Sequence, residues 1–192
     1  MMVPMADSEA TNESLAPTLL LSMPQLSDPN FHQTVVLLCE HNPAGAFGLV
    51  LNRPTETPAA SAVQLDPPIL GASPMPLWAG GPVEPHRGWI LLGEETEEGE
   101  ALEICRGLYL STSPLLLRRL LEGAPSRRAR LLNGYAGWGP GQLDEELAAS
   151  AWLTSDVELD LVFDTEAALM WEAAIRRLGA DPALLQMSHG VH

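Results

Sequence analysis

Short apolar runs separated by turn residues dominate the first half of the chain and predict a β-sheet. Thr18–Ser22 and Thr34–Cys39 are such runs, and the second opens with three β-branched residues, as is typical of strands buried on both faces. Phe47–Leu51 follows across a turn that contains proline and glycine, a spacing that predicts an antiparallel hairpin. Further strands are predicted at Leu77–Gly81, Trp89–Leu92, Leu108–Leu110, Ala129–Asn133 and Leu159–Phe163.

Helical periodicity is stronger in the second half. Ser113-Pro114 supplies an N-cap followed by proline, and leucines at i,i+4 spacing continue to Gly123, so a helix is predicted between them. Gln142–Ser150 is predicted to be a second helix. Thr165–Leu178 has the clearest apolar stripe, with a predicted cap at its threonine and two arginines in its last turn. A short helix is predicted to start at Asp181-Pro182.

Three segments are predicted to lie outside regular structure. Residues 54–76 contain six prolines, which exclude a long helix or a central strand and predict a surface excursion with one helical turn at Ala59–Leu65. Glu94–Glu100 contains five glutamates, whose mutual repulsion predicts a solvated loop. Gly134–Gly141 contains four glycines and is predicted to be a glycine-rich loop.

The length and the apolar content predict one folded domain. The chain has 192 residues, of which 46% are hydrophobic, enough for a sizeable core. We expect this domain to span residues 18–186, between a disordered arm at 1–17 and a loose tail at 187–192. All ten basic residues are arginines, so catalysis by a Schiff-base lysine, a phosphate-loop lysine or a Ser-x-x-Lys pair is excluded.

Location is predicted from the absence of targeting signals. The first 17 residues contain acids but no arginine and no continuous apolar stretch, unlike a secretory signal. The strongest apolar runs, such as Val35–Cys39, have four or five residues, whereas a membrane-spanning helix needs about 20. Two cysteines are too few for a disulfide framework and are predicted to be reduced thiols. The prediction is a cytoplasmic protein without membrane contact.

Four blocks, in order along the chain, match a known pattern. They are Met23-Pro24 with Asp28–Phe31, Thr34–His41 and Gly48–Pro54; Gly80–Val83 with Arg87-Gly88; Ser111–Ser113; and Gly134–Leu143, which continues through Glu145-Glu146 to Trp152-Leu153. In these blocks the chain resembles the AlgH/YqgE family of bacterial proteins over about residues 18–186.

The resemblance implies a fold more sharply than a function. It implies one α+β domain built on a branched, partly barrel-like mixed β-sheet with helices packed around it. The family is largely uncharacterised, some members carry the label of transcriptional regulator, and it supplies no catalytic residues to carry over. The proline-rich residues 55–76 depart from the family pattern.

Polar and aromatic residues at the ends of predicted elements are the candidate contacts. In the predicted glycine-rich loop, the aromatic side chains either pack against bare backbone or form a surface for a neutral ligand or a protein partner. The candidate ligand or partner contacts are Asn52, Arg53, Arg87, Tyr135, Trp138 and Gln142.

An anion site is a further hypothesis at the predicted helix after Ser113. Ser111, Thr112 and Ser113 precede a first turn without acids, and two arginines follow at positions 118 and 119. Helix capping explains one of the hydroxyl groups. The alternative is a small anion held by the hydroxyls and neighbouring amides.

Metal and nucleic-acid sites are disfavoured. Cys39 and His41 can share one face of a strand, but a structural zinc site needs four ligands and no C-x-x-C is present, so no metal or cofactor is predicted. Residues 118–130 contain five arginines against one glutamate, yet the whole chain has a net charge of −15. Long-range repulsion from so acidic a body disfavours direct DNA binding, and docking of an acidic partner is the alternative use.

These observations favour a non-enzymatic cytoplasmic binding or regulatory protein that acts through an unknown protein or small-molecule partner. Two alternatives remain open. One is an enzyme that uses the Ser111–Ser113 hydroxyls with His86 or His41 as base. The other is a transcriptional regulator that binds DNA directly.

Overall fold

The computed structural model describes the chain over four ranges, residues 13–71, 73–96, 99–123 and 126–187. Most of the predicted arm, the last five residues of the predicted tail and part of the acidic loop Glu94–Glu100 lie outside these ranges. The boundaries predicted for the domain therefore stay predictions.

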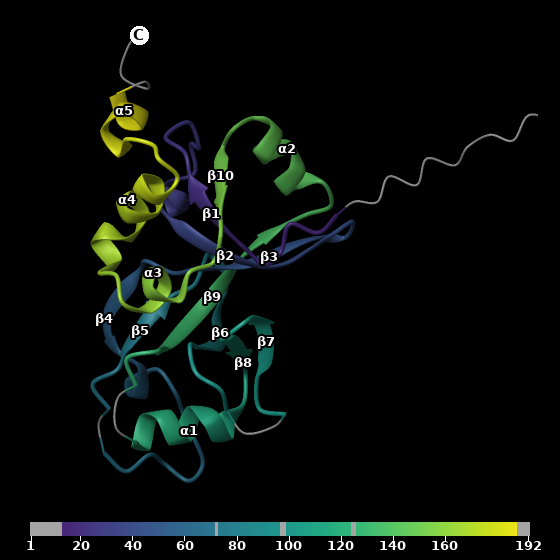
Figure 1. Ribbon diagram of the computed structural model, residues 1–192. Coiled ribbons are helices and arrows are strands. Elements are labelled where there is room, and N and C mark those ends of the chain that lie inside the picture. Colours follow the sequence, from purple (N-terminus) through teal and green to yellow (C-terminus); the bar gives the residue numbers. More distant parts are fainter. Residues whose placement is uncertain (1–12, 72, 97–98, 124–125, 188–192) are drawn as a thin grey trace, which may run out of the picture.

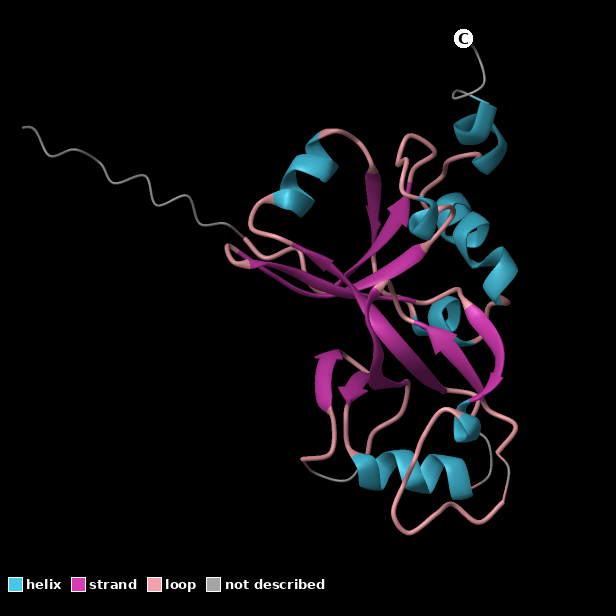
Figure 2. Cartoon of the chain, turned by 180° about the vertical axis from the view of Figure 1, so that it is seen from behind, coloured by secondary structure: helices cyan, strands magenta, loops and turns pink. Residues whose placement is uncertain are grey.

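Ten strands in the described ranges form one branched sheet with two wings (Figures 1 and 2). The strands are β1 (Thr18–Ser22), β2 (Val35–Asn42), β3 (Gly45–Val50), β4 (Pro54–Pro58), β5 (Pro76–Ala79), β6 (Val83–Leu92), β7 (Leu102–Cys105), β8 (Leu108–Ser111), β9 (Ala129–Trp138) and β10 (Trp152–Ser155). The main path runs in the order β10-β1-β2-β3-β9-β6-β8-β7, and β5 with β4 branches from β9.

Strand β9 joins the two wings. Its first part pairs with β5 in parallel and with β6 antiparallel, whereas its last three residues, Ala136–Trp138, pair with β3. The β5–β9 pair is the parallel one; the other pairings are antiparallel. The α+β fold on a branched mixed sheet is thus confirmed, and the sheet stays open at β10, β7 and β4 instead of closing into a barrel.

Five α-helices and two short 3-10 turns accompany the sheet in the described ranges. They are η1 (Pro29–Phe31), η2 (Ala59–Ser61), α1 (Pro114–Glu122), α2 (Gln142–Ala148), α3 (Leu159–Phe163), α4 (Ala167–Arg177) and α5 (Pro182–Met187). Figure 1 shows α2, α4 and α5 around the wing that holds β1, β2 and β10, and α1 below the other wing. None of these helices combines the length and the apolar character that a membrane span requires.

Two local predictions in the last third are wrong. Leu159–Phe163 is the helix α3, because a short apolar run fits a buried helical turn as well as a strand, and Leu161, Val162 and Phe163 are all buried. Thr165 does not cap α4. Its hydroxyl donates to the Asp160 carbonyl at 3.2 Å, and the N-cap residue is Glu166, which makes no side-chain capping bond.

The prediction of a loop over Gly134–Gly141 is also wrong, because β9 continues through this segment to Trp138. Gly134 has a φ of +74°, and a Cβ built on it would lie 2.3 Å from the carbonyl oxygen of Gly81. This glycine allows a close approach of two backbones where the wings meet, which a sequence cannot distinguish from a turn. The loop is confined to the three residues Gly139–Gly141.

The proline-rich excursion contains more structure than predicted. Pro54–Pro58 is the edge strand β4, a position that tolerates proline, and the predicted helical turn is the 3-10 turn at Ala59–Ser61. Strands β7 and β10 were not predicted. Each has four residues, too few to show a period.

Three buried clusters hold the elements together. The largest lies between the two wings and includes the inner faces of β1, β2 and β3 together with α3 and α4. A second cluster packs the opposite face of β1 and β2 against α2, and a third packs β6 and β9 against α1. The largest cluster is bordered by partly buried aromatic side chains from β3, β6 and β9, and these frame the site described below.

Candidate functional site

A cleft of about 480 Å³ opens at the border of the largest core cluster, between the β2–β3 hairpin and strands β6, β7 and β8. We call it the aromatic cleft; it is lined by Cys39, Glu40, Ala46, Phe47, Arg87, Trp89, Leu102, Ile104, Leu110 and Tyr135. It has the size and the apolar wall of a small-molecule or side-chain binding site.

Three aromatic side chains, Phe47, Trp89 and Tyr135, form one wall of the cleft. The ring centroids of Phe47 and Trp89 are 4.8 Å apart, and those of Phe47 and Tyr135 are 5.2 Å apart. Trp89 and Tyr135 meet edge to face at 6.2 Å. These separations are those of favourable aromatic pairs. All three rings remain partly exposed, so they present a preformed apolar surface.

Charged groups lie at the rim of the aromatic cleft. The Arg87 guanidinium carbon is 4.6 Å from the centre of the Trp89 ring, and its Nη1 is 3.2 Å from Glu84 Oε2. Both members of this ion pair are about half exposed, so the pair itself contributes little to stability. Burial and the nearby Glu84 raise the pKa of the Tyr135 phenol, which therefore remains neutral at physiological pH.

Burial also controls the thiol in the cleft. Desolvation raises the pKa of Cys39 from about 9 to about 12, with added contributions from Cys105 and Glu40. The pKa of Cys105 is also raised, by burial and by Glu103. Both cysteines are unpaired thiols, and Cys39 is neutral at physiological pH, so the structure does not make it a nucleophile.

The raised pKa predicts a loss of stability in alkali. Because the folded Cys39 holds its proton more tightly than the unfolded residue, its contribution is complete below pH 9 and is lost as pH rises toward 12. We expect the free energy of unfolding to fall by up to about 1.4 kcal/mol per pH unit in this window from this one group. Urea unfolding at several pH values should show this slope, and Cys39→Ala should reduce it. An unchanged slope in the variant would refute the assignment.

The structure does not bring the six predicted contact residues together. Arg87 and Tyr135 lie in the aromatic cleft. Asn52 is buried and holds the backbone of the preceding loop: its Oδ1 accepts from Val35 N at 3.0 Å and its Nδ2 donates to the Gln33 carbonyl at 2.9 Å. Arg53 lies beside it, half-buried, at a different pocket.

Trp138 and Gln142 lie at a third location, where β9 ends and α2 begins. Trp138 is only 7% exposed, and its Nε1 donates to Glu146 Oε2 at 2.9 Å. Gln142 Nε2 donates to Glu146 Oε1 at 2.9 Å, and its own Oε1 accepts from Gly139 N at 3.1 Å. Trp138 therefore packs in the core, and the contact role expected for it does not fit its burial.

The Ser111 and Ser113 hydroxyl groups of the anion and enzyme hypotheses make local hydrogen bonds. Ser113 Oγ caps α1 by accepting from Leu116 N at 3.3 Å, and Ser111 Oγ accepts from Ser113 N at 3.0 Å. Thr112, Ser113 and His86 do border one cavity of about 260 Å³. In the described ranges, no hydrogen bond joins any of these hydroxyls to an imidazole.

His41 is likewise engaged elsewhere. Its Nδ1 accepts from Leu15 N at 3.3 Å and its Nε2 lies 3.3 Å from Asp144 Oδ1. Among the residues that the structure describes, no group of three or more His, Cys, Asp or Glu side chains is arranged to hold a metal ion.

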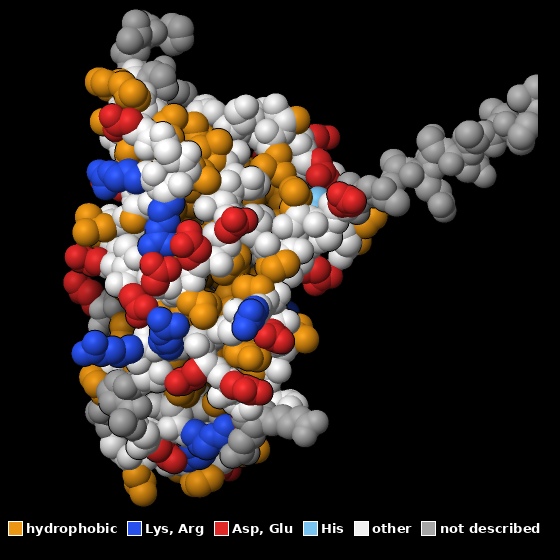
Figure 3. Space-filling model, viewed as in Figure 1, with side chains coloured by type: hydrophobic (Ala, Val, Ile, Leu, Met, Phe, Trp, Pro, Cys, Tyr) orange, Lys and Arg blue, Asp and Glu red, His pale blue; other side chains and the backbone are white. Residues whose placement is uncertain are grey.

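The arginine-rich segment 118–130 is largely neutralised by its own surroundings. Arg118 pairs with Glu122 at 2.9 Å, Arg119 pairs with Glu100, and Arg128 pairs with Asp164 at 2.8 Å. Arg130 stacks over the rings of Trp78 and Phe163, and the fifth arginine, Arg127, is exposed. Figure 3 shows blue and red side chains interleaved on this face, with no continuous basic patch of the kind that tracks a DNA backbone.

The family model for AlgH-like proteins matches residues 19–183. The chain belongs to the AlgH-like family. AlgH-like relatives include a UPF0301 protein of Myxococcus xanthus, 41% identical over 182 residues, which cover 94% of this chain and 99% of the relative. A UPF0301 protein of Pseudomonas fluorescens is 41% identical over 175 residues, 89% of this chain and 92% of the relative.

Solved structures agree with this AlgH-like assignment. The solution structure of AlgH from Pseudomonas aeruginosa superimposes with a TM-score of 0.75 at 35% identity and covers 100% of both chains. A crystal structure of a Corynebacterium diphtheriae protein has a TM-score of 0.67 at 20% identity over 92% of both chains, and it supports the fold alone. The predicted resemblance is confirmed.

Sequence reasoning missed the main components of the aromatic cleft. Phe47 and Trp89 lie within predicted strands, where an aromatic residue normally indicates a core position. The available signal was the period of two: Arg87 and Trp89 are separated by one residue, as are Phe47 and the β3 core residue Leu49, so each pair shares one face of its strand. What the sequence does not show is that these two faces meet at the border of the core.

Proposed function

We propose that this AlgH-like protein is a non-enzymatic, cytoplasmic binding protein that accepts an apolar group of a protein or small-molecule partner in the aromatic cleft. One observation carries the proposal: three aromatic rings, in mutual contact and partly exposed, line a cleft of about 480 Å³ whose charged groups lie at the rim. Any regulatory role is then exerted through such a partner.

The chemistry of the cleft supports binding over catalysis. Its thiol is held neutral by a pKa of about 12, and the tyrosine pKa is raised, so neither group is activated at physiological pH. The walls offer apolar area and stacking surfaces, which drive association through desolvation. The free thiols support a reducing compartment.

Indole is a suitable probe for this proposal because it is a flat apolar group with a single N–H. We expect it to bind the aromatic cleft and Tyr135→Ala to weaken this binding at least tenfold, since the variant removes one stacking wall. The measurement is an NMR titration that follows the backbone amides around the cleft. Tyr109→Ala is the matched control, because the other tyrosine of the chain packs in the core cluster against α1.

Tyr109→Ala should bind indole as the wild type does. Equal weakening by both variants would indicate a general loss of packing, and an unchanged affinity in Tyr135→Ala would overturn the assignment of the cleft.

A further inference from the structure

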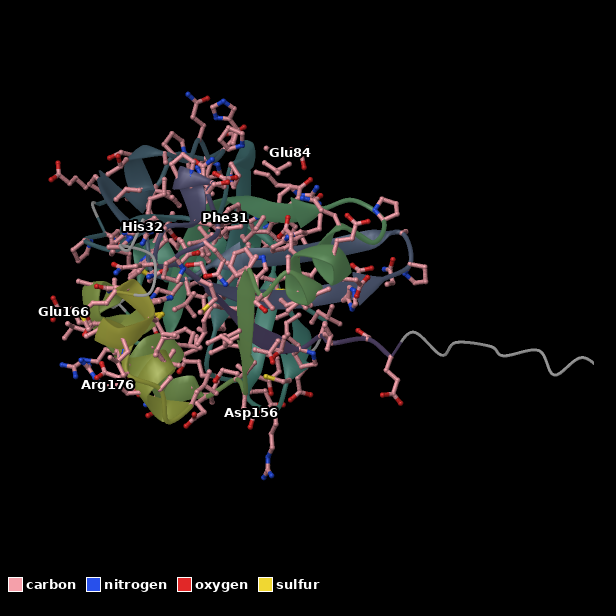
Figure 4. All side chains as sticks on the ribbon, turned by 90° about the horizontal axis from the view of Figure 1, so that it is seen from above. Phe31, His32, Glu84, Asp156, Glu166 and Arg176 are labelled. Atoms are coloured by element: carbon pink, nitrogen blue, oxygen red, sulfur yellow. The ribbon has the colours of Figure 1, made fainter. Side chains whose placement is uncertain are left out.

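A second pocket lies between α4 and the segments that precede β2 and β4, and it shares no lining residue with the aromatic cleft. It encloses about 230 Å³, and the side chains of His32, Gln33, Arg53 and Trp171 border it. A neighbouring pocket of about 300 Å³ is also lined by His32, Gln33 and Trp171. The two pockets therefore form one groove along the loop that precedes β2. Figure 4 shows His32 on the same side of the molecule as Glu166, the N-cap residue of α4.

Arg53 supplies a positive charge at the border of this pocket. Six of the ten arginines form ion pairs with carboxylates in the described ranges. Arg53 forms none there: its Nη1 donates to the Asn52 carbonyl at 3.4 Å and its Nη2 donates to the His32 carbonyl. In a chain with 25 carboxylates, this is a half-buried guanidinium without a counter-charge.

The electrostatic setting favours an anion over a neutral occupant. Burial lowers the pKa of Arg53, which records the cost of holding this charge away from water, yet the group stays protonated. Glu172 also borders the pocket, but Arg176 pairs with it at 2.8 Å. The guanidinium is thus the charge in the pocket that lacks compensation.

The pocket is also held in shape before any ligand arrives. Asn52 Nδ2 donates a hydrogen bond to the Gln33 carbonyl at 2.9 Å. This bond supports Gln33 in a left-handed conformation, with a φ of +50°, that few residues other than glycine adopt. On the other wall, Trp171 is 2% exposed and donates its Nε1 to the Ser22 carbonyl at 2.9 Å. Preorganised walls reduce the entropy lost on binding.

We propose that this pocket binds the oxyanion group of a small molecule, with Arg53 as the principal donor. Two N–H groups of the guanidinium are used by carbonyls, and the others have no partner in the described ranges, so they can form the paired bonds that carboxylates and phosphates accept. This site is independent of the aromatic cleft and goes beyond the function proposed for it.

The test is an NMR titration of the full chain with inorganic phosphate and, separately, with acetate. We expect at least one of them to produce saturable shifts at the Arg53 side-chain Nε–H and at the amides of His32, Gln33 and Ala168. Arg53→Gln should weaken binding at least tenfold. Arg127→Gln is the control for net charge, because Arg127 is exposed and remote from the pocket, and it should bind as the wild type does.

The wild-type side-chain signal keeps the proposal testable even where Arg53→Gln fails to fold. Saturation by phosphate alone or by acetate alone supports the site and identifies the oxyanion it prefers. Shifts that increase linearly without saturation, shifts that leave the Arg53 Nε–H unmoved, or equal binding by Arg53→Gln would each overturn it. In those cases Arg53 serves only to tie the His32 loop to β4.

Discussion

Glu146→Ala is expected to destabilise the protein by about 2–4 kcal/mol, because one carboxylate serves two buried indoles. Glu146 Oε2 accepts from Trp138 Nε1 at 2.9 Å and from Trp152 Nε1 at 2.7 Å. The two tryptophans are 7% and 3% exposed, so few water molecules can reach the indoles to replace the lost acceptor. Without it, two buried N–H donors are left unpaired. Chemical unfolding monitored by tryptophan fluorescence measures the change.

Glu145→Ala is the matched control for this prediction. It removes the same charge from the same helix, but Glu145 is exposed and makes no described contact with either tryptophan. We expect a loss below about 1 kcal/mol, the size of an interaction with the helix dipole. A loss of less than 1 kcal/mol in Glu146→Ala itself would show that the indoles do not depend on this carboxylate.

Gly81→Ala is expected to cost about 3 kcal/mol or more, since two unfavourable effects combine at this position. Its φ is +151°, and a Cβ built there would lie 2.1 Å from the carbonyl carbon of Tyr135. The contact is with backbone, which cannot rotate away as a side chain can. Because Gly81 faces β9 where the two wings join, the clash must separate β6 from β9 or bend the branch point.

The control is Gly88→Ala on the adjoining strand β6. A Cβ at Gly88 would meet nothing closer than 3.8 Å, an ordinary contact, and its φ lies outside the range that favours glycine, so we expect a change of less than about 1 kcal/mol. Thermal melts of both variants compare the two sites directly. Equal melting temperatures for the two variants would contradict the role given to Gly81.

Local signals predicted the elements that are decided locally. The β2–β3 hairpin and α1 followed from an apolar run, a turn and a Ser-Pro cap, and each of these is read within a few residues. The errors occurred where contacts with a distant segment determine the local secondary structure. Glycine is typical of turns, but Gly134 lies within strand β9, where its lack of a side chain allows the backbone of Gly81, 53 positions earlier, to approach closely. Leu159–Phe163 is helical because of the core it enters.

The candidate site was predictable only in part for the same reason. Arg87 and Tyr135 were chosen because they lie at the ends of predicted elements, and the fold places both in the aromatic cleft. Phe47 and Trp89 complete it from strands that are distant in sequence. Trp138, chosen for the same reason as Tyr135, faces the opposite core because it lies three residues further along β9, where side chains alternate between the two faces. Three-dimensional closeness of this kind has no counterpart in residue spacing.

The most direct test of the proposed function is to observe the contact between the probe and the aromatic cleft. Intermolecular nuclear Overhauser effects between indole and the ring protons of Phe47, Trp89 and Tyr135 should appear in the wild type at saturating indole. The binding account predicts cross-peaks to all three rings. Cross-peaks confined to other parts of the surface, or none at concentrations where amide shifts saturate, would contradict it.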